Sequence, residues 1–372
     1  MFSMIHISPT LSPFTLIKSF FSSSENFIPN IIQFSYARGA LIGAIKSIVV
    51  HFNINKEITV WTPSFISDTV IYLLEAYNIK VSHYPITNSL EPDWDKLSFI
   101  QFMEEDIFLL VHYFGFEMAT QETIEFCKTK KLHMIEDCAH GIVPKIKNGG
   151  IGTHGDAAIF GLRKVLAVPH GGFLYMKNIK FSAPNNVSMV SGIYRSPLKM
   201  ILLWLLCKLK VKYVLNLKPI KKFVMTESPE NYSLFDFQEN MDSISRKITN
   251  TVNINEISEK RISNYLYYKK NLSVISKIFI PISFKIKNKQ TSPWMFFFFY
   301  EQAEELINFL RKNGIPAADW PTLHPSILGN PDYDFENYLY KRSVALPVHQ
   351  DMNQKDLDFI INKIKEFDMQ LR

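Results

Sequence analysis

The first half of the chain alternates between two patterns of hydrophobic positions. Apolar residues three or four positions apart predict helices, and short apolar runs between them predict strands. The predicted helices cover Gly39–Val50, Ser67–Tyr77 and Thr120–Lys130, and the predicted strands cover Ile58–Ser64, Val81–Ile86, Ile107–Tyr113, Met134–Asp137, Ala157–Leu162 and Gly172–Met176. Because strands alternate with helices, the pattern predicts an α/β fold with a three-layer, mostly parallel sheet covered by helices.

The pattern changes after Thr226. Residues Tyr232–Lys270 are polar with periodic Ile and Tyr, which predicts one long helix joining two domains. Beyond it we expect a strand at Trp294–Tyr300 and helices at Gln302–Asn313 and Gln354–Phe367. The chain is therefore expected to divide into a large α/β domain, residues 1–240, and a small α+β domain, residues 241–372.

Composition excludes several classes of protein. Hydrophobic residues make up 47% of the chain, including 30 Phe and 16 Tyr, which excludes a disordered protein. The longest stretch without charge, Met1–Ile17, contains two prolines and is shorter than the roughly 20 apolar residues of a membrane span. It also lacks the pattern of a signal peptide, so we expect a cytoplasmic protein.

The cysteine spacing and the charge distribution exclude further kinds of site and partner. Cys127, Cys138 and Cys207 form no C-x-x-C pair, so we expect reduced thiols and no zinc ribbon. The formal net charge of +6 is modest, and no nucleic-acid partner is expected. Residues Ala157–Thr226 contain 12 Lys and Arg and no Asp or Glu, while the rest of the chain is acidic, with 29 basic and 35 acidic residues.

This basic segment includes an apolar stretch with two interpretations. Met200–Cys207 (MILLWLLC) is followed by Lys208, Lys210 and Lys212. One interpretation is a peripheral membrane contact through residues 197–222, and the other is a helix buried against the body of the protein or a partner copy.

One short motif matches a dinucleotide-binding pattern but lacks its context. Gly150–Gly155 fits G-x-G-x-x-G, which requires a preceding strand, a following helix and an acidic residue about 20 positions later. Here a polar turn precedes it, a strand-like run follows, and the next acidic residue after Asp156 is Glu227. We interpret the motif as a glycine turn.

Three other elements carry candidate chemistry. Asp137 ends a predicted strand, where open α/β sheets bind ligands; it could pair with a cationic ligand such as a pyridinium nitrogen, or cap the next turn. Cys138 and His140 lack a second ligand pair, so no metal site is predicted.

Lys164 lies among apolar residues beside Arg163, and burial with a neighbouring cation favours the free amine that forms a Schiff base. Arg38-Gly39-Ala40 opens a predicted helix whose N-terminus could bind phosphate.

In their order along the chain, these elements resemble the DegT/DnrJ/EryC1/StrS family of pyridoxal-phosphate-dependent sugar aminotransferases, which have the fold type I architecture. The likeness covers about residues 30–367. The motifs that carry it are Arg38-Gly39-Ala40-Leu41, Pro63-Ser64-Phe65, His112-Tyr113-Phe114-Gly115, Glu136-Asp137-Cys138-Ala139-His140, Gly152-Thr153-His154-Gly155-Asp156, Lys164, Gly171-Gly172, Asn313-Gly314-Ile315, Trp320-Pro321 and Leu346-Pro347-Val348-His349.

The resemblance implies a role for each site residue. Lys164 would bind pyridoxal 5'-phosphate as a Schiff base and move the substrate proton. Asp137 would pair with the pyridinium nitrogen. His140 would contact the ring hydroxyl, and Arg38, Gly39 and Ala40 would hold the phosphate.

Two departures from the family pattern affect further residues. Gly161 stands where a phosphate-binding serine is expected, so Arg163 is a candidate replacement. The usual ring-stacking position holds Ser67, which leaves Phe65 or a residue from another loop for that role.

The reaction implied is transfer of an amino group from an amino acid, by family habit glutamate, to a keto sugar carried on a nucleotide, in surface polysaccharide or glycan biosynthesis. Family habit also implies a homodimer. The enzymatic alternative is dehydration of a related sugar, but dehydrating members replace the lysine that is present here as Lys164. The alternative from another class is an inactive member that binds a membrane surface or a partner.

Overall fold

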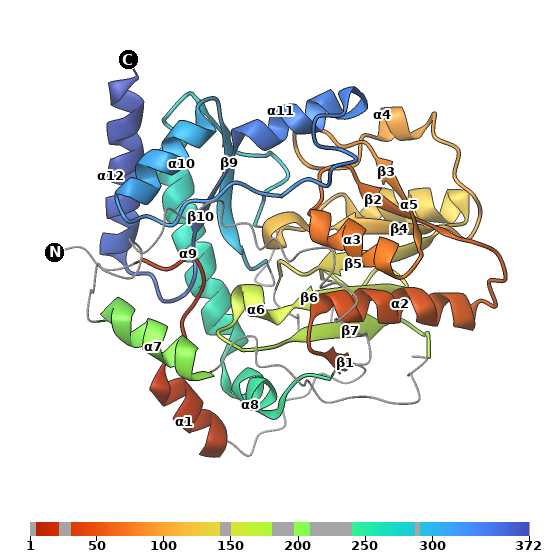
Figure 1. Ribbon diagram of the computed structural model, residues 1–372, viewed down its shortest axis with the longest axis horizontal. Helices are drawn as coiled ribbons and strands as arrows, with labels where there is room; N and C mark the ends of the chain where they lie inside the picture. Colours follow the sequence, from red (N-terminus) through yellow and green to blue (C-terminus); the bar gives the residue numbers. More distant parts are fainter. Residues whose placement is uncertain are drawn as a thin grey trace.

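A computed structural model describes residues 5–21, 31–141, 150–180, 197–208, 240–286 and 291–371 of the protein. A seven-stranded sheet and the helices packed on it form the right side of the view in Figure 1. Its strands are β1 (Ile31–Phe34), β2 (Thr59–Pro63), β3 (Lys80–Tyr84), β4 (Ile107–Val111), β5 (His133–Cys138), β6 (Ala157–Gly161) and β7 (Gly172–Met176). The helices of residues 1–240 are α1 (Pro13–Phe21), α2 (Ala37–His51), α3 (Asp68–Ala76), α4 (Trp94–Leu97), α5 (Thr120–Lys130), α6 (Leu162–Val165) and α7 (Pro197–Lys208). Of these, α1 and α7 lie at the lower left of the view, away from the sheet.

The strands follow the order β1-β7-β6-β5-β4-β2-β3. Neighbours from β3 to β6 run parallel, whereas β7 pairs antiparallel with both β6 and β1. Every residue of β4 and of β6 is buried, as expected for strands covered on both faces. The predicted α/β fold with a mostly parallel sheet is confirmed.

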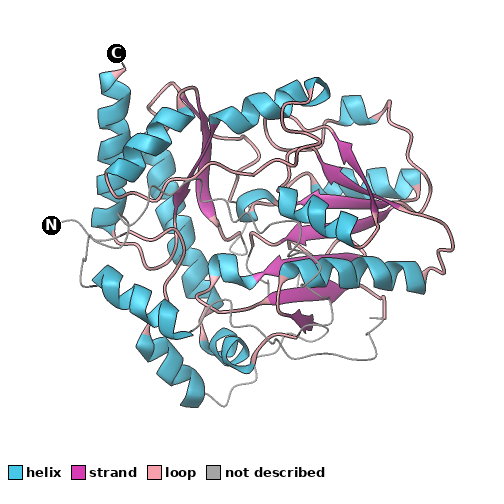
Figure 2. Cartoon of the chain, in the orientation of Figure 1, coloured by secondary structure: helices cyan, strands magenta, loops and turns pink. Residues whose placement is uncertain are grey.

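The remaining elements form a smaller unit at the left of the same view. They are α8 (Ser243–Thr251), α9 (Ile254–Leu272), β8 (Ile278–Phe279), β9 (Met295–Tyr300), α10 (Ala303–Lys312), α11 (Asp334–Arg342), β10 (Ser343–Pro347) and α12 (Gln354–Gln370). Strands β8, β9 and β10 make a three-stranded antiparallel sheet beside α9, α10 and α12 (Figure 2). The division at residue 240 stays a prediction.

The single helix predicted over Tyr232–Lys270 is wrong for the described part, which contains two helices. Val252, between α8 and α9, has an extended backbone, with φ −75° and ψ 142°. Asn253 then caps α9, because its side chain accepts hydrogen bonds from the backbone N–H groups of Asn255 and Glu256. Residues 232–239 of the prediction lie outside the described part of the chain.

Two buried apolar clusters stabilise the described structure. The larger one runs from the parallel sheet through α9 to β9 and α12, so it joins both units. The smaller one lies between the β6 and β7 edge and the helices α1, α7 and α8, which meet at the lower left of Figure 1. Among the described residues, no helix is both long and apolar enough to cross a membrane.

Candidate active site

A cavity of about 500 Å³ opens where β4, β5 and β6 end, beside the start of α2. Val111, Asp137 and Ile159 are paired across these three strands and all line it. Alternate residues of a strand point to opposite faces of the sheet, so the neighbouring row, which includes Glu136, faces away from the cavity. The cavity therefore lies at the edge where parallel sheets bind ligands.

Asp137 brings a buried carboxylate to the cavity wall. Its side chain is 8% exposed, and Oδ1 accepts a hydrogen bond from the backbone N–H of Ala139 at 2.8 Å. Burial raises the pKa of Asp137, while the charge of Lys164 and the Ala139 hydrogen bond act against that rise. A cationic ligand nitrogen beside this carboxylate would be stabilised by it.

Lys164 comes from α6, the single helical turn that follows β6, and lines the same cavity. Loss of solvation lowers the pKa of its ammonium from 10.5 to about 8; Asp137 opposes the shift, and Arg38 and Arg163 add to it. Its Nζ lies 4.8 Å from the centre of the Trp294 ring. The free-amine fraction at neutral pH is therefore far larger than for a solvated lysine.

His140 follows β5 and adds a neutral imidazole. The backbone N–H of Phe114 donates to His140 Nδ1 at 3.0 Å, so Nε2 carries the ring proton. Burial lowers the pKa of His140 well below its usual range, and Lys164 lowers it further. The rings of Trp294 and Trp320 pack against the imidazole, with centroids 4.4 and 5.1 Å away. Sequence reasoning did not place either tryptophan at the site, since Trp294 was noted only as the start of a predicted strand and Trp320 only as part of a Trp-Pro pair.

The start of α2 is the candidate anion site. The helix begins at Ala37, two residues before the predicted start, and its N-cap residue, Tyr36, makes no side-chain capping bond. The guanidinium groups of Arg38 and Arg163 lie 5.6 and 5.0 Å from the Tyr36 ring centre. Both arginines line the cavity, so two cations meet beside a helix N-terminus.

Three predicted site residues do not line the cavity. Gly39 and Ala40 are buried in the first turns of α2, while the flanking Ala37 and Leu41 line the cavity instead. Any contact of Gly39 with an anion would therefore be through its backbone N–H.

Phe65, the third of these residues, was predicted as a stacking aromatic. It is fully buried, its carbonyl accepts from Tyr113 Oη at 2.7 Å, and its ring lies 6.0 Å from the Trp320 ring. Ile66 and Ser67 line the cavity in its place. The prediction that Phe65 faces the ligand is wrong, because the chain turns its ring into the core.

Packing explains the absence of a serine at position 161. A Cβ atom on Gly161 would lie 2.8 Å from the carbonyl oxygen of Ala139, closer than side chains tolerate. At Gly172, a Cβ atom would overlap the backbone of Tyr36 and Ala37. Both glycines let β6 and β7 approach the segments that form the cavity wall.

The turn that resembles a dinucleotide motif wraps a buried carboxylate. Glu136 accepts backbone hydrogen bonds from Gly152, His154 and Gly155 at 2.7–2.8 Å, and a fourth bond from His112 Nε2 at 2.9 Å. Burial tends to raise the pKa of Glu136, but the bonds from His112, Gly155 and Gly152 keep it below its usual range. The interpretation as a glycine turn is confirmed.

The same turn brings together three potential metal ligands. His112, Glu136 and Cys138 have ligand atoms within 4.8 Å of one another, all buried. Because His112 also accepts at Nδ1 from the backbone N–H of Met118, hydrogen bonds occupy both of its ring nitrogens and both Glu136 oxygens. These contacts explain the cluster as structural. His140, considered with Cys138 on sequence grounds, contacts the cavity instead.

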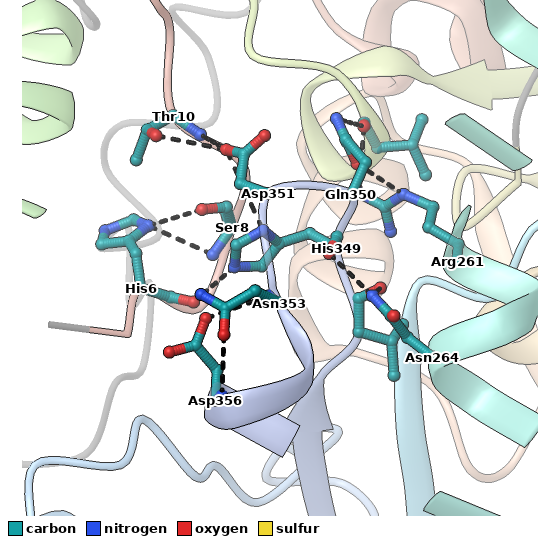
Figure 3. Close-up of polar contacts among 12 residues, drawn as sticks. His6, Ser8, Thr10, Arg261, Asn264, His349, Gln350, Asp351, Asn353 and Asp356 are labelled. Carbon is teal, nitrogen blue, oxygen red and sulfur yellow. Dashed lines mark hydrogen bonds and ion pairs between the residues drawn. The ribbon is translucent and has the colours of Figure 1, made fainter. Parts of the chain in front are cut away.

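Arg261 in α9 ties the segments around the cavity together. Its side chain is fully buried and donates to the carbonyls of Val165, Pro293 and Trp294 at 3.0–3.3 Å, and to Gln350 Oε1 at 2.9 Å. Figure 3 shows it beside Gln350. Val165 follows Lys164, so Arg261 connects the lysine turn to Trp294. Sequence reasoning missed this residue, because a single arginine in a polar helix has no distinguishing pattern.

The N-terminal segment forms another wall of the cavity. Residues 6–10 line it, although they precede the first predicted element. Thr10 donates through its backbone N–H to Asp351 at 2.8 Å, and His349 Nε2 donates to the carbonyl of His6 at 2.8 Å (Figure 3). The loop after β10 therefore holds the N-terminus against the site.

Comparison with known proteins agrees with this geometry. The sequence model of the DegT/DnrJ/EryC1/StrS aminotransferase family matches residues 101–199, the part that carries Asp137, His140 and Lys164. This match confirms the predicted resemblance and the predicted class of enzyme, an aminotransferase. The predicted cofactor, pyridoxal 5'-phosphate, agrees with this family and with a structural neighbour solved in its PLP form. A search of curated proteins finds no match.

Solved structures share the fold at low sequence identity. Spr1654 of Streptococcus pneumoniae, named as a putative sugar aminotransferase and solved in its PLP form, is 14% identical, with a TM-score of 0.67 and full coverage of both chains. PseC of Helicobacter pylori, an aminotransferase of pseudoaminic acid biosynthesis, is 13% identical, with a TM-score of 0.65 over 99% of this chain and 100% of its own. CalS13 of Micromonospora echinospora, a sugar aminotransferase, is 14% identical, with a TM-score of 0.62 over 98% and 100%.

The cavity suits pyridoxal 5'-phosphate in three respects. It offers an amine of lowered pKa at Lys164, a buried carboxylate at Asp137, and two guanidinium groups beside a helix N-terminus. These are the chemical partners of an aldehyde, a pyridinium nitrogen and a phosphate.

Proposed function

We propose that the protein transfers an amino group from an amino acid, with glutamate as donor, to a keto sugar carried on a nucleotide, in surface polysaccharide or glycan biosynthesis. The observation that carries this proposal is the position of Lys164 in one cavity with Asp137, with its pKa lowered to about 8. The sugar substrate is supported by the structural neighbours, several of which are sugar aminotransferases. A homodimer is proposed from the family resemblance.

In this proposal each residue acts on a defined part of the cofactor. Lys164 binds the aldehyde carbon through Nζ, and Asp137 pairs with the ring nitrogen. His140 donates from Nε2 to the ring hydroxyl, since its Nδ1 already accepts from Phe114. Arg38 and Arg163 bind the phosphate together with backbone N–H groups of Ala37, Arg38 and Gly39 at the start of α2.

The cofactor, when bound, supplies an electron sink for the carbon that loses its proton. Once the donor amine has replaced it on the aldehyde carbon, Lys164 Nζ would be a free amine able to hold that proton and give it up again, and its lowered pKa favours both directions of transfer near neutral pH. Asp137 stays ionised beside a cation and stabilises positive charge on the ring. Trp294 covers the His140 imidazole and restricts water on that side.

Absorption spectroscopy of the purified full-length protein with pyridoxal 5'-phosphate tests the lysine assignment. We expect a visible band that borohydride abolishes, with the added cofactor mass on the peptide containing Lys164. Lys164→Ala should lose both the band and the labelled peptide. Lys177→Ala, which removes an exposed lysine directly after β7, is the matched control and should keep both. A reducible band that persists in Lys164→Ala would contradict the assignment.

A second assay tests the substrates separately. Glutamate and a nucleotide-linked keto sugar should yield 2-oxoglutarate and the amino sugar, detected by mass spectrometry. If the Lys164 label forms but no nucleotide-linked keto sugar is aminated, the cofactor assignment stands and the proposed substrate class is wrong. Dehydration of the sugar without loss of amine from glutamate would favour the alternative reaction.

A further inference from the structure

Two helices far apart in sequence expose apolar side chains at the same corner of the molecule. On α1, Phe14, Ile17 and Phe21 are spaced three and four residues apart, and Phe14 and Phe21 are 76% and 86% exposed. On α7, Leu198, Leu202 and Leu205 follow the same spacing, and Leu198 is 77% exposed. Each helix thus has an outward apolar stripe.

The opposite sides of both helices are already packed against the protein. The smaller buried cluster includes Leu11, just before α1, and Met200 of α7. Leu16 of α1 and Ile201 of α7 pack against this cluster. The outward stripes are therefore additional apolar surface, beyond what the fold needs to attach these helices. We call Phe14, Ile17, Phe21, Leu198, Leu202 and Leu205 the outer stripe. Exposed apolar side chains gathered at one corner of the molecule are typical of an interaction site.

Within their bounds, the helices that carry or flank the outer stripe have charge of one sign. The helices α1, α7 and α8 contain five Lys and Arg and no Asp or Glu within their bounds. Lys18 is exposed on α1, and Lys247 of α8 places its Nζ 5.0 Å from the Phe20 ring. The nearest acid in the sequence of α8, its N-cap Asp242, is bound to His170 at 2.7 Å. A partner that is apolar at its centre and anionic around it would match this surface.

We propose that the outer stripe docks on the surface of an anionic lipid bilayer, with its Phe and Leu side chains at the acyl boundary and the surrounding cations against lipid phosphates. Helices with aromatic and aliphatic residues beside Lys and Arg bind bilayers in this way. A second copy fits less well, because a twofold contact places the same surface against itself and brings like charges together. The inference does not depend on the proposed reaction.

Both helices adjoin the candidate active site. Thr10 lines the cavity three residues before α1 begins, and Met200 lines it from α7. Docking would therefore place the cavity wall formed by these residues at the bilayer. Of the predicted membrane contact through 197–222, residues 209–222 lie outside the described part of the chain.

Vesicle flotation of the purified full-length protein tests the proposal. We expect flotation with vesicles of phosphatidylcholine and phosphatidylglycerol, weak flotation with phosphatidylcholine alone, and release at 1 M salt, where the screening length falls to about 3 Å. Phe14→Ser with Phe21→Ser should lower the partition coefficient about tenfold or more. Lys18→Gln and Lys247→Gln should each lower it about fivefold.

Matched controls separate docking from general surface effects. Phe99→Ser with Val274→Ser removes two apolar side chains of similar exposure, 90% and 74%, away from these helices, and should float like the parent. All variants should keep the parent's circular dichroism and thermal midpoint. The salt and lipid dependence of the parent needs no variant, so misfolding cannot hide the result.

Three outcomes would overturn the proposal: no flotation of the parent, equal flotation with neutral and anionic vesicles, or equal loss in the control variant. Sedimentation without vesicles tests the other candidate occupant of the outer stripe, a second copy of the chain. If Phe14→Ser with Phe21→Ser converts a dimer to a monomer, the outer stripe is an interface between copies and the bilayer assignment is wrong.

Discussion

Glu136 and Asp137 are adjacent carboxylates on one strand, but their surroundings on the two faces of the sheet are opposite. Glu136 accepts three backbone hydrogen bonds and one from His112, and these keep its pKa below the usual range. Asp137 accepts a backbone hydrogen bond from Ala139, and burial raises its pKa. One carboxylate has its partners inside the fold, and the other faces a cavity.

The difference shows how one strand can place a structural carboxylate on one face of the sheet and a ligand-binding carboxylate on the other. A buried carboxylate that is fully hydrogen-bonded holds a turn and has little capacity left for a ligand. A buried carboxylate with fewer bonds is costly by itself, and it is stabilised when a cation binds beside it. Asp137 therefore has the properties of a ligand-binding group, and Glu136 has those of a structural one.

The largest expected effect is on activity, from Asp137→Asn. The amide keeps the shape and can still accept from Ala139, but it loses the charge that faces the cavity, so we expect activity to fall about 10²–10³-fold. Stability should stay the same or rise slightly, since a buried charge is removed. Steady-state kinetics and urea unfolding check both expectations. Unchanged activity would remove Asp137 from the proposed site.

Glu136→Gln should have the opposite effect to Asp137→Asn, lowering stability rather than cofactor binding. Its amide nitrogen cannot accept bonds from Gly152 or the turn's other N–H groups, so we expect unfolding to become easier by about 2–4 kcal/mol. The folded fraction should still bind pyridoxal 5'-phosphate, measured by visible absorption. Loss of cofactor binding without loss of stability would break the distinction between the two carboxylates.

Lys164→Met should stabilise the cofactor-free protein. The pKa of Lys164 is about 8 in the folded chain and about 10.5 when solvated, so charging this residue opposes folding. The penalty is fully present below pH 8 and shrinks as the pH rises towards 10.5, where the unfolded chain also loses the proton. We expect a gain of about 1–3 kcal/mol near pH 7 that disappears by about pH 10.5. Urea unfolding across this pH range measures it, and a gain independent of pH would contradict the assignment.

Gly161→Ser has the smallest expected effect. It tests the packing of β6 against Ala139, which follows the strand that carries both carboxylates. The added Cβ meets the Ala139 carbonyl, so we expect a loss of about 1–3 kcal/mol in stability and no gain in cofactor affinity. Gly314→Ser is a control for the added side chain: its Cβ would have open space, although its φ of +77° also disfavours serine. Tighter cofactor binding in Gly161→Ser would show that the site can accept the usual family serine.

Much of the fold could be predicted because hydrophobic periodicity is a local property. The run Ile107–Tyr113 and the run at Gly172–Met176 correspond to β4 and β7. The break at Val252 could not be predicted, because polar sequence with periodic Ile fits one helix as well as two. The antiparallel pairing of β7 and β1 was also not evident, since apolar runs do not encode strand direction.

The site was predictable where a residue type has a strong chemical meaning. Asp137, His140 and Lys164 line one cavity with Arg38 and Arg163, as expected. Phe65 faces the core instead, and the cavity walls formed by Trp294, Trp320 and residues 6–10 come from distant parts of the chain. These cavity walls depend on packing between distant segments of the chain, which local sequence patterns do not predict.

The amino-acid sequence by itself determined the alternating strands and helices from α2 to β7, the basic segment and the residues capable of the chemistry, because periodicity, charge and side-chain type are local properties of the chain. Only the tertiary structure decided that Glu136 and Asp137 have opposite roles, that Gly161 has no room for a side chain, and that α1 and α7 expose apolar stripes together. The physical reason is that burial, hydrogen bonding and lost solvation depend on neighbours that the chain supplies only when it is folded.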